Sequence, residues 1–247
     1  IPNYIAEGLI CKGMTSTAVY IRDGIPFFQR AYKIADSIQS DQPKLKALYH
    51  LASAELNIKR FDSAYAAIHN LLALAEESKQ DKYLAHAYTL LGNYHIKIRN
   101  SAESFRAHQK ALSIAKVESY PLERVTALNN LAYWYSSHDK SDSALLFLEE
   151  SKSILEEHPS WKSEAYVHSS IARIYRDRNQ NELAIEIYPK AIAAYESVGH
   201  QIAASRVRNH FAISLSGVGR HADAIEIYLE NIRFFEALEA PKELAAA

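Results

Sequence analysis

Apolar residues recur at spacings of three and four along extended stretches of the chain, such as residues 44–58 and 62–79. This spacing puts the apolar side chains on one face of an α-helix. The chain has only 7 Gly and 7 Pro in 247 residues, which is little turn punctuation for a multi-stranded β-protein. Polar or turn-forming pairs interrupt the pattern at regular intervals, namely Lys59-Arg60, Arg99-Asn100, Asp139-Lys140, Asn179-Gln180 and Gly219-Arg220. The pattern therefore predicts an all-α chain.

A single period, about 40 residues long, organises these helices. AIEIYPKA begins at Ala184, and AIEIYLEN begins at Ala224. Frames that start at Leu45, Ala85, Val125, Ala165 and Ser205 align without a gap, and slot n denotes the nth residue of such a frame. Slots 8 and 20 hold small residues throughout: Ala52, Gly92, Ala132, Ala172, Ala212, Ala64, Ser104, Ala144, Ala184 and Ala224. Slots 7 and 21 hold large ones: Leu51, Leu91, Leu131, Ile171, Phe211, Tyr65, Phe105, Leu145, Ile185 and Ile225. Small residues let two helix backbones approach closely, so each frame predicts a helix, a short turn and a second helix.

These residues resemble the tetratricopeptide repeat family, whose motif has small residues at slots 8, 20 and 27 and aromatic residues near slots 11 and 24. The frame 85–124 matches best, with Gly92, Ser104 and Ala111 in the small slots. Departures are Leu71 and Asn231 at slot 27, and His95 and His108 in place of aromatic residues. The family's usual repeat is shorter, at about 34 residues. The longer form resembles the repeats of kinesin light chains, Leu-Gly-Asn repeat adaptors and bacterial sensor or regulator regions. The resemblance implies an α-solenoid, a right-handed superhelix of stacked antiparallel helix pairs with about six repeats.

The frame predicts one array over residues 1–247. Its parts are a degenerate first repeat (1–44), five repeats (45–84, 85–124, 125–164, 165–204 and 205–244) and the start of a truncated next repeat (245–247). Residues 1–20 match a first helix poorly. The final PKELAAA overlays on DKYLAHA at 81–87, so we expect the sequence to be a fragment of a longer protein. Pro189 falls inside a predicted helix, where it removes the hydrogen bond to the carbonyl of Ile185, and we expect a bend there.

The resemblance implies that first-helix residues line a concave groove that binds peptides. The candidate groove residues are Lys46, Tyr49, His50, Asn93, Lys97, Asn129, Asn130, Tyr133, Arg173, Arg176, Arg206, Asn209 and His210. The cations among the groove slots face a single acid there, Asp177. Such a surface suits an acidic peptide or a C-terminal carboxylate, although plain solvated helix faces are the alternative. The two-carboxylate clamp of chaperone-binding members is not matched, since Thr89, Tyr166 and Ser170 stand where basic residues belong.

The charge balance of 28 Lys+Arg against 29 Asp+Glu gives no global field toward nucleic acid, and no apolar run is long enough to span a membrane. The 11 His show no metal-ligand spacing, and His95, His108 and His168 fit packed or boundary positions. Cys11 has no activating neighbour in sequence, which favours a small buried apolar role. We therefore expect no catalysis, no metal and no cofactor.

The sequence predicts a protein–protein interaction module that binds a peptide or protein segment. One alternative is the sensory or regulatory region of a larger bacterial signalling or transcription-regulating protein. A second, an RNA-binding helical-repeat protein, would need a longer basic stripe than five groove cations provide. The single cysteine requires no oxidising compartment, so the cytoplasm is favoured and the periplasm is the alternative. The oligomeric state and the identity of the partner stay open.

Overall fold

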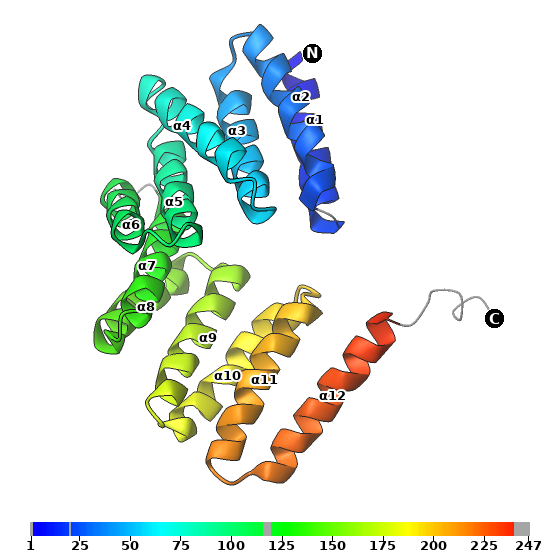
Figure 1. The fold of residues 1–247 in the computed structure, drawn as a ribbon, viewed down its shortest axis with the longest axis vertical. Coiled ribbons are helices and arrows are strands. Elements are labelled where there is room, and N and C mark those ends of the chain that lie inside the picture. The colour runs from blue at the N-terminus through cyan, green and yellow to red at the C-terminus, as the bar shows by residue number, and fades with distance from the viewer. Residues whose placement is uncertain (1, 20, 116–119, 240–247) are drawn as a thin grey trace, which may run out of the picture. The chain divides into compact units, whose positions relative to one another are not determined.

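The computed structural model describes residues 2–19, 21–115 and 120–239. Figure 1 shows this part of the chain as helices joined by short turns. They are α1 (Pro2–Val19), α2 (Ile21–Ser37), α3 (Asp41–Asn57), α4 (Phe61–Glu77), α5 (Asp81–Lys97), α6 (Ser101–Ala115), α7 (Pro121–Ser136), α8 (Ser141–Glu157), α9 (Trp161–Asp177), α10 (Asn181–Glu196), α11 (Gln201–Gly217) and α12 (His221–Glu239). From α3 onward, the start of each first helix and of each second helix recurs at the offset seen in the sequence, which confirms the period.

The turn between the two helices of a repeat has the same geometry five times. Slot 15 is held by Lys59, Arg99, Asp139, Asn179 and Gly219, whose φ angles lie between 56° and 81°. The next residue then donates its backbone N–H to a carbonyl five residues back, as from Arg60 to Glu55 at 2.9 Å and from Arg220 to Leu215 at 2.9 Å. This left-handed closure satisfies carbonyls that the helix end leaves free. The polar pairs in the sequence therefore mark real turns.

The small residues lie where the helices of a repeat meet: all ten residues at slots 8 and 20 are buried. Slot 24 is equally buried in four repeats, in which Ile68, His108, Leu148 and Tyr188 are at most 1% exposed. The same pattern predicts that Tyr228, at slot 24 of the last repeat, fills the space beside the small residue Ala224. That expectation is wrong, because Tyr228 is 36% exposed and no described helix follows α12 to cover it.

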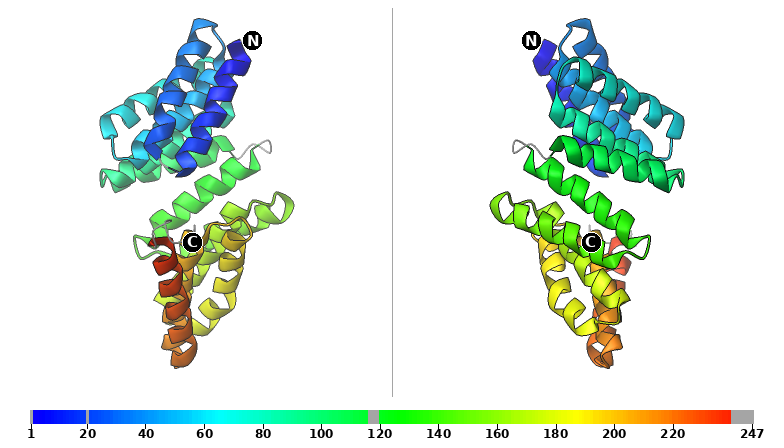
Figure 2. Two further views of the ribbon diagram at one scale, coloured as in Figure 1. Left: turned by 90° about the vertical axis from the view of Figure 1, so that its right-hand side faces the viewer. Right: turned by 90° about the vertical axis from the view of Figure 1, so that its left-hand side faces the viewer.

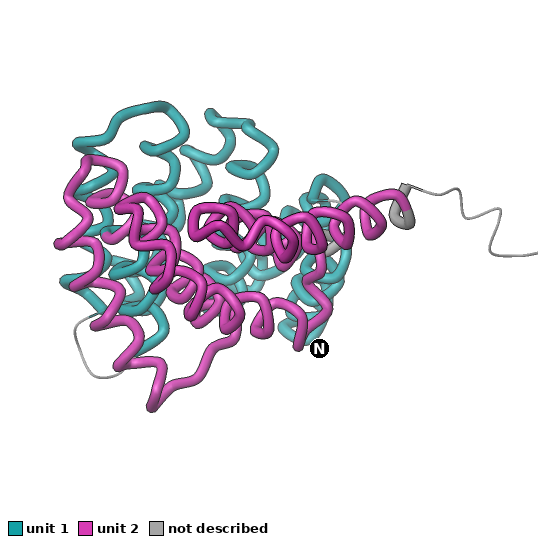
Figure 3. Tube along the Cα trace, turned by 90° about the horizontal axis from the view of Figure 1, so that it is seen from below, with its two compact units in different colours: residues 1–131 teal, residues 132–247 magenta. Residues whose placement is uncertain are grey.

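The chain forms two compact units, residues 1–131 and 132–247, and the boundary lies inside α7 (Figure 3). In the first unit, Leu45, Leu48, Ile68 and Leu71 form a core between α3 and α4 that Leu90 of α5 extends. In the second unit, α9, α10 and α11 share a core of alanines around Tyr188 and Val207. Consecutive helices lie side by side from α1 to α6 in the first unit and from α8 to α12 in the second (Figure 2).

The segment that matched the repeat least is nevertheless a full helix. Helix α1 packs against α2 and α3 and buries Ala6 and Ile10 completely. Cys11, expected to be buried, is exposed. Cys11 occupies slot 7, whose later residues Leu51 and Phe211 pack against the preceding second helix, and no described helix precedes α1.

Helix α10 runs without a break through Pro189, and the bend there stays a prediction. The expected start of a further repeat at 245–247 lies outside the described residues. Among the helices that the structure describes, none is both long and apolar enough to cross a membrane.

Candidate peptide-binding surface

The predicted groove residues all lie on the first helices of the repeats, α3, α5, α7, α9 and α11. Seven of them, from Lys46 to Asn130, belong to the first unit, and six, from Tyr133 to His210, belong to the second.

Aromatic and imidazole rings from α2, α3 and α5 form a row in the first unit. The ring of His50 stacks on Phe28 at a centroid distance of 5.3 Å, and Tyr49 lies between His50 at 5.1 Å and His86 at 4.7 Å. Beside the row is a pocket of about 250 Å³, lined by Ile21, Phe28, His50, Ser53, Ala54 and Asn57. Burial, assisted by the charge of Lys46, lowers the pKa of His50 to about 4. His50 is therefore neutral at pH 7 and presents one donor and one acceptor to a ligand.

Carboxylates from outside the groove slots neutralise much of the charge in this unit. Glu7 Oε2 lies 2.6 Å from Lys46 Nζ, and this hydrogen bond raises the pKa of Lys46. Glu123 Oε1 lies 3.4 Å from His86 Nε2 and 3.5 Å from Lys82 Nζ on α5. Lys97 is exposed at the end of α5 and has no ion pair within the described part of the chain. The first unit is thus less basic than the groove slots alone indicate.

The amides expected in the groove differ in accessibility. Asn129 is only 6% exposed and offers little surface to a ligand, whereas Asn93 and Asn130 are half-buried. Asn130 Nδ2 is buried and makes no hydrogen bond with the residues that the structure describes. An unsatisfied amide donor of this kind gains from an incoming carbonyl or carboxylate oxygen.

In the second unit, two guanidinium groups on α9 share one carboxylate. Arg176 donates from Nε and Nη2 to Asp177 Oδ1 at 3.1 and 2.7 Å. Arg173 Nη1 lies 3.9 Å from Asp177 Oδ2, and its Nη2 donates to Ser136 Oγ at 3.5 Å. Arg206 on α11 is exposed and has no ion pair among the described residues. We use the name arginine cluster for the three arginines at the groove slots of this unit, Arg173, Arg176 and Arg206.

His210 on α11 contacts one arginine of α9, Arg176. Its Nδ1 lies 2.6 Å from Arg176 Nη1. Burial and then Arg176 lower the pKa of His210, so the imidazole is neutral at pH 7, and Nδ1 accepts a hydrogen bond from the guanidinium group. Asn209, one residue earlier, accepts a hydrogen bond from Asn231 Nδ2 at 2.8 Å, and Tyr133 on α7 is 45% exposed. The groove slots of this unit therefore keep a net positive charge from three arginines and one carboxylate, whereas Lys97 is the one groove lysine of the first unit without an ion pair among the described residues.

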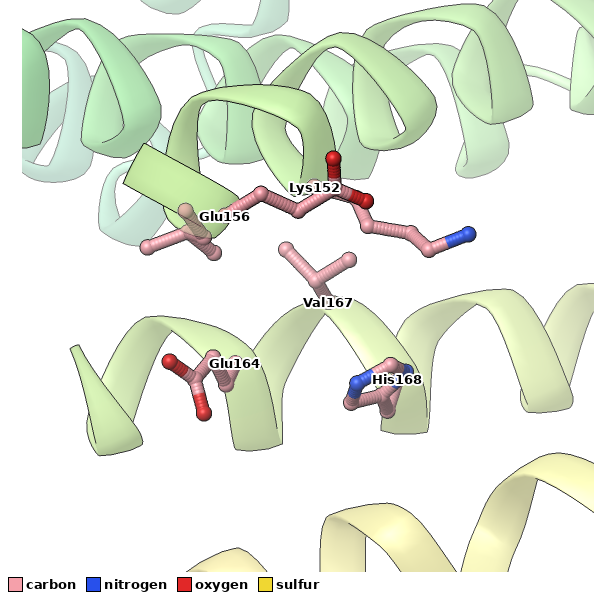
Figure 4. Close-up of a pocket in the computed structure, with 6 residues that line it drawn as sticks. Lys152, Glu156, Glu164, Val167 and His168 are labelled. Atoms are coloured by element: carbon pink, nitrogen blue, oxygen red, sulfur yellow. The ribbon is translucent and has the colours of Figure 1, made fainter. Parts of the chain in front are cut away.

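A separate pocket of about 280 Å³ lies between α8 and α9, where the sequence singled out only His168 (Figure 4). Leu155 and Val167 form its apolar part, and Lys152, Glu156, Glu164 and His168 supply charged or polar groups. Burial lowers the pKa of His168, which is half-buried as the sequence indicated. Among the described residues, no three His, Cys, Asp or Glu side chains gather in a way that could hold a metal ion.

No protein-family model matches the sequence, and no curated protein matches it. Solved structures do resemble the fold. BtubC (BKLC) from P. vanneervenii is 16% identical, with a TM-score of 0.74 over 90% of this chain and 94% of that one.

Two further structures are similar. A Signal Transduction ATPase with Numerous Domains (STAND) protein from Pyrococcus horikoshii, which has a tetratricopeptide repeat sensor, is 16% identical, with a TM-score of 0.73 over 96% of this chain and only 36% of that one. A Rap protein complexed with Competence and Sporulation Factor is 12% identical, with a TM-score of 0.72 over 93% of this chain and 74% of that one. This chain therefore has the fold of a tetratricopeptide-repeat helical solenoid.

Proposed function

We propose that the protein binds a peptide or protein segment along the first-helix surface, and that acidic groups of the ligand are bound by the arginine cluster. The observation that supports this most is the charge imbalance on α9 and α11: Arg173 and Arg176 share one carboxylate, Asp177, and Arg206 has no ion pair among the described residues. The contact between Arg176 and Asp177 shows the geometry in which this guanidinium takes a carboxylate. Arg makes strong, oriented bonds to such groups.

The first unit offers a candidate surface of a different character. Its row of Phe28, His50, Tyr49 and His86 combines aromatic faces with neutral imidazoles, while Lys46 is already paired with Glu7. Aromatic and amide groups suit side-chain packing and the backbone of an extended peptide. We infer that acidic groups of a ligand are bound in the second unit, and that the surface of the first unit suits apolar side chains or the backbone of a peptide. No part of this proposal requires catalysis, a metal or a cofactor.

The test uses a random 12-residue peptide library selected on the immobilised chain, followed by fluorescence anisotropy of the enriched peptides. We expect enrichment of Asp and Glu, and an affinity about tenfold or more lower for Arg173→Glu/Arg206→Glu, because two attractive contacts become repulsive. The matched control is Arg30→Glu/Arg106→Glu, which makes the same change of charge at exposed positions on second helices. Peptides without acidic enrichment, or equal weakening by both double variants, would contradict the proposal.

A regulatory role is the second candidate, supported by the likeness in fold to a protein described as having a tetratricopeptide repeat sensor. In that case the ligand would be a signal, and binding would alter an output domain elsewhere in the polypeptide. The open reading frame that contains this sequence distinguishes the two candidates: an output domain in the same frame favours regulation, and repeats alone favour a scaffold.

A further inference from the structure

A pocket of about 250 Å³ lies between α2 and α3, beside the row of rings in the first unit. It is lined by Ile21 and Phe28 of α2 and by His50, Ser53, Ala54 and Asn57 of α3. Both helices have described neighbours, since α1 packs against α2 and α3, and α4 packs against α3. Pockets for drug-sized ligands have volumes of about 300–1,000 Å³, so this one suits a single side chain better than a whole small molecule. We call it the α2–α3 pocket.

The pocket is present because slot 10 of this repeat holds a small residue. That slot is Ala54 in α3, whereas the next three repeats have the larger residues Tyr94, Trp134 and Ile174 there. Ile21, which lines the pocket from slot 17 of α2, stays 38% exposed, and this is high for a large apolar side chain beside another helix. Ala54 is too short to cover it.

The last repeat also has a small residue at slot 10, Ser214, but there the space is closed in another way. Asn181, which corresponds to Ile21, lies so close to α11 that a Cβ atom added at Gly217 would be 2.4 Å from its Nδ2. Between α2 and α3, no described side chain closes the space in that way, and the pocket stays open.

Tyr94 shows what kind of side chain fits the space. Its ring lies 6.3 Å from the ring of Phe61 and 5.2 Å from the ring of Tyr65, which are the slot 17 and slot 21 residues of α4. The corresponding residues of α2 are Ile21 and Ile25. One repeat later, a tyrosine ring therefore packs against the same face of the preceding second helix, at the place where the α2–α3 pocket is open.

The polar side of the α2–α3 pocket is uncharged. Burial lowers the pKa of His50 to about 4, so its imidazole is neutral at pH 7 and has one donor and one acceptor. The hydroxyl of Ser53 and the amide of Asn57 have no hydrogen bond to the described residues. Lys46, the cation that helps to lower the pKa of His50, is held by Glu7 at 2.6 Å. A hydroxyl group finds donors and acceptors here, whereas a carboxylate finds no cation among the residues that line the pocket.

We propose that the α2–α3 pocket binds a tyrosine side chain of the peptide ligand. The ring lies against Ile21, Phe28 and Ala54, and the phenol hydroxyl makes a hydrogen bond to Ser53 or Asn57. The inference rests on the proposed function only in that the tyrosine belongs to a peptide bound along the first helices. Recognition of the side chain itself requires neither an acidic group nor the arginine cluster.

The probe is N-acetyl-tyrosine amide, which carries no acidic group, titrated into the chain with ¹³C-labelled isoleucine and alanine methyl groups. We expect saturable shifts of the Ile21 and Ala54 methyl resonances in NMR spectra. N-acetyl-phenylalanine amide should shift the same resonances with an affinity about 2–10-fold lower, because it lacks the hydrogen bond of the phenol hydroxyl.

Two variants of the pocket test the assignment in different ways. Ala54→Tyr fills the pocket with the slot 10 residue of the next repeat, and it should abolish binding of the probe. Ala102→Tyr, at an exposed position of α6, is the matched control and should leave binding unchanged. Ser53→Ala/Asn57→Ala keeps the pocket open but removes the polar partners, so both probes should then bind with the same affinity. Circular dichroism checks that each variant keeps its helical content.

The selected acidic peptides connect the pocket to the ligand. A tyrosine should be enriched in them, and its replacement by alanine should lower the affinity about tenfold or more for the native chain but not for Ala54→Tyr. Absence of saturable shifts, equal affinity of the two probes for the native chain, or unchanged binding by Ala54→Tyr would overturn the proposal, whatever the arginine variants do. If the probe binds as expected and Arg173→Glu/Arg206→Glu leaves the peptides unaffected, the pocket is supported and the proposed function is refuted.

Discussion

The substitution Gly92→Ala should destabilise the first unit by about 1–2 kcal/mol, because it overpacks a closed helix contact. A Cβ atom at Gly92 would lie 2.4 Å from His108 Cε1 and 2.6 Å from both ring nitrogens. His108 is 0% exposed, so its ring has no free space to enter. Overpacking of this kind costs about 1–3 kcal/mol, and the better helix propensity of Ala offsets about 0.5–1 kcal/mol of it.

The preceding repeat suggests a second substitution that should restore the stability lost by Gly92→Ala. There the same two slots hold Ala52 and Ile68, which are both fully buried in one cluster. The double variant Gly92→Ala/His108→Ile should therefore be at least as stable as the native chain. It also removes two ring nitrogens that are buried without hydrogen bonds among the described residues.

Chemical denaturation followed by circular dichroism measures these changes in the free energy of unfolding. Gly8→Ala is the matched control, because Gly8 lies in α1 of the same unit and nothing within 4 Å would meet its Cβ. It should stabilise the unit by about 0.5–1 kcal/mol. If Gly92→Ala stabilises the chain as Gly8→Ala does, or if His108→Ile gives no rescue, the account of this contact is wrong.

Three further predictions concern pH and backbone. Burial lowers the pKa of His108 to about 4, so the unfolded chain binds a proton at this residue at a higher pH than the folded chain does. The free energy of unfolding should therefore fall as the pH drops from 6.5 to about 4. His108→Ile should remove roughly 3 kcal/mol of that loss in denaturation curves recorded across this range. Arg99 has a φ of 62° at its turn, so Arg99→Gly should stabilise the chain by about 1 kcal/mol, while Gly219→Ala, at a φ of 81°, should destabilise it by a similar amount. Pro189→Ala should raise stability by about 1–3 kcal/mol, because it restores the N–H that can bond the carbonyl of Ile185. A thermal melt that shows no gain for Pro189→Ala would mean that α10 has adapted to its proline.

The repeat could be predicted from the sequence because its physical causes act on single residues. A close helix contact requires a small side chain, so Ala52 and Ala64 mark it directly, and the same slots are buried in every repeat. A left-handed turn residue needs glycine or a polar side chain, as at Asn179 and Gly219. These requirements recur at the same slots of each frame and reinforce one another.

The charges of the candidate site could not be predicted in the same way. Lys46 has its partner 39 residues earlier, at Glu7, in a helix that matches the motif poorly. Glu123 reaches His86 from a slot that the groove pattern does not include. The exposure of Cys11 and the burial of Asn129 depend likewise on which helices cover them, and helix coverage is a property of the assembled fold.

Photo-cross-linking locates the bound peptide on the surface of the protein. An acidic peptide selected on the chain, with a benzophenone amino acid beside its acidic residue, is irradiated in the complex, and the attachment sites are mapped by mass spectrometry. We expect cross-links on α9 and α11, close to Arg173, Arg176 and Arg206, and their loss in Arg173→Glu/Arg206→Glu. Cross-links concentrated on the second helices α8, α10 and α12 would contradict this expectation.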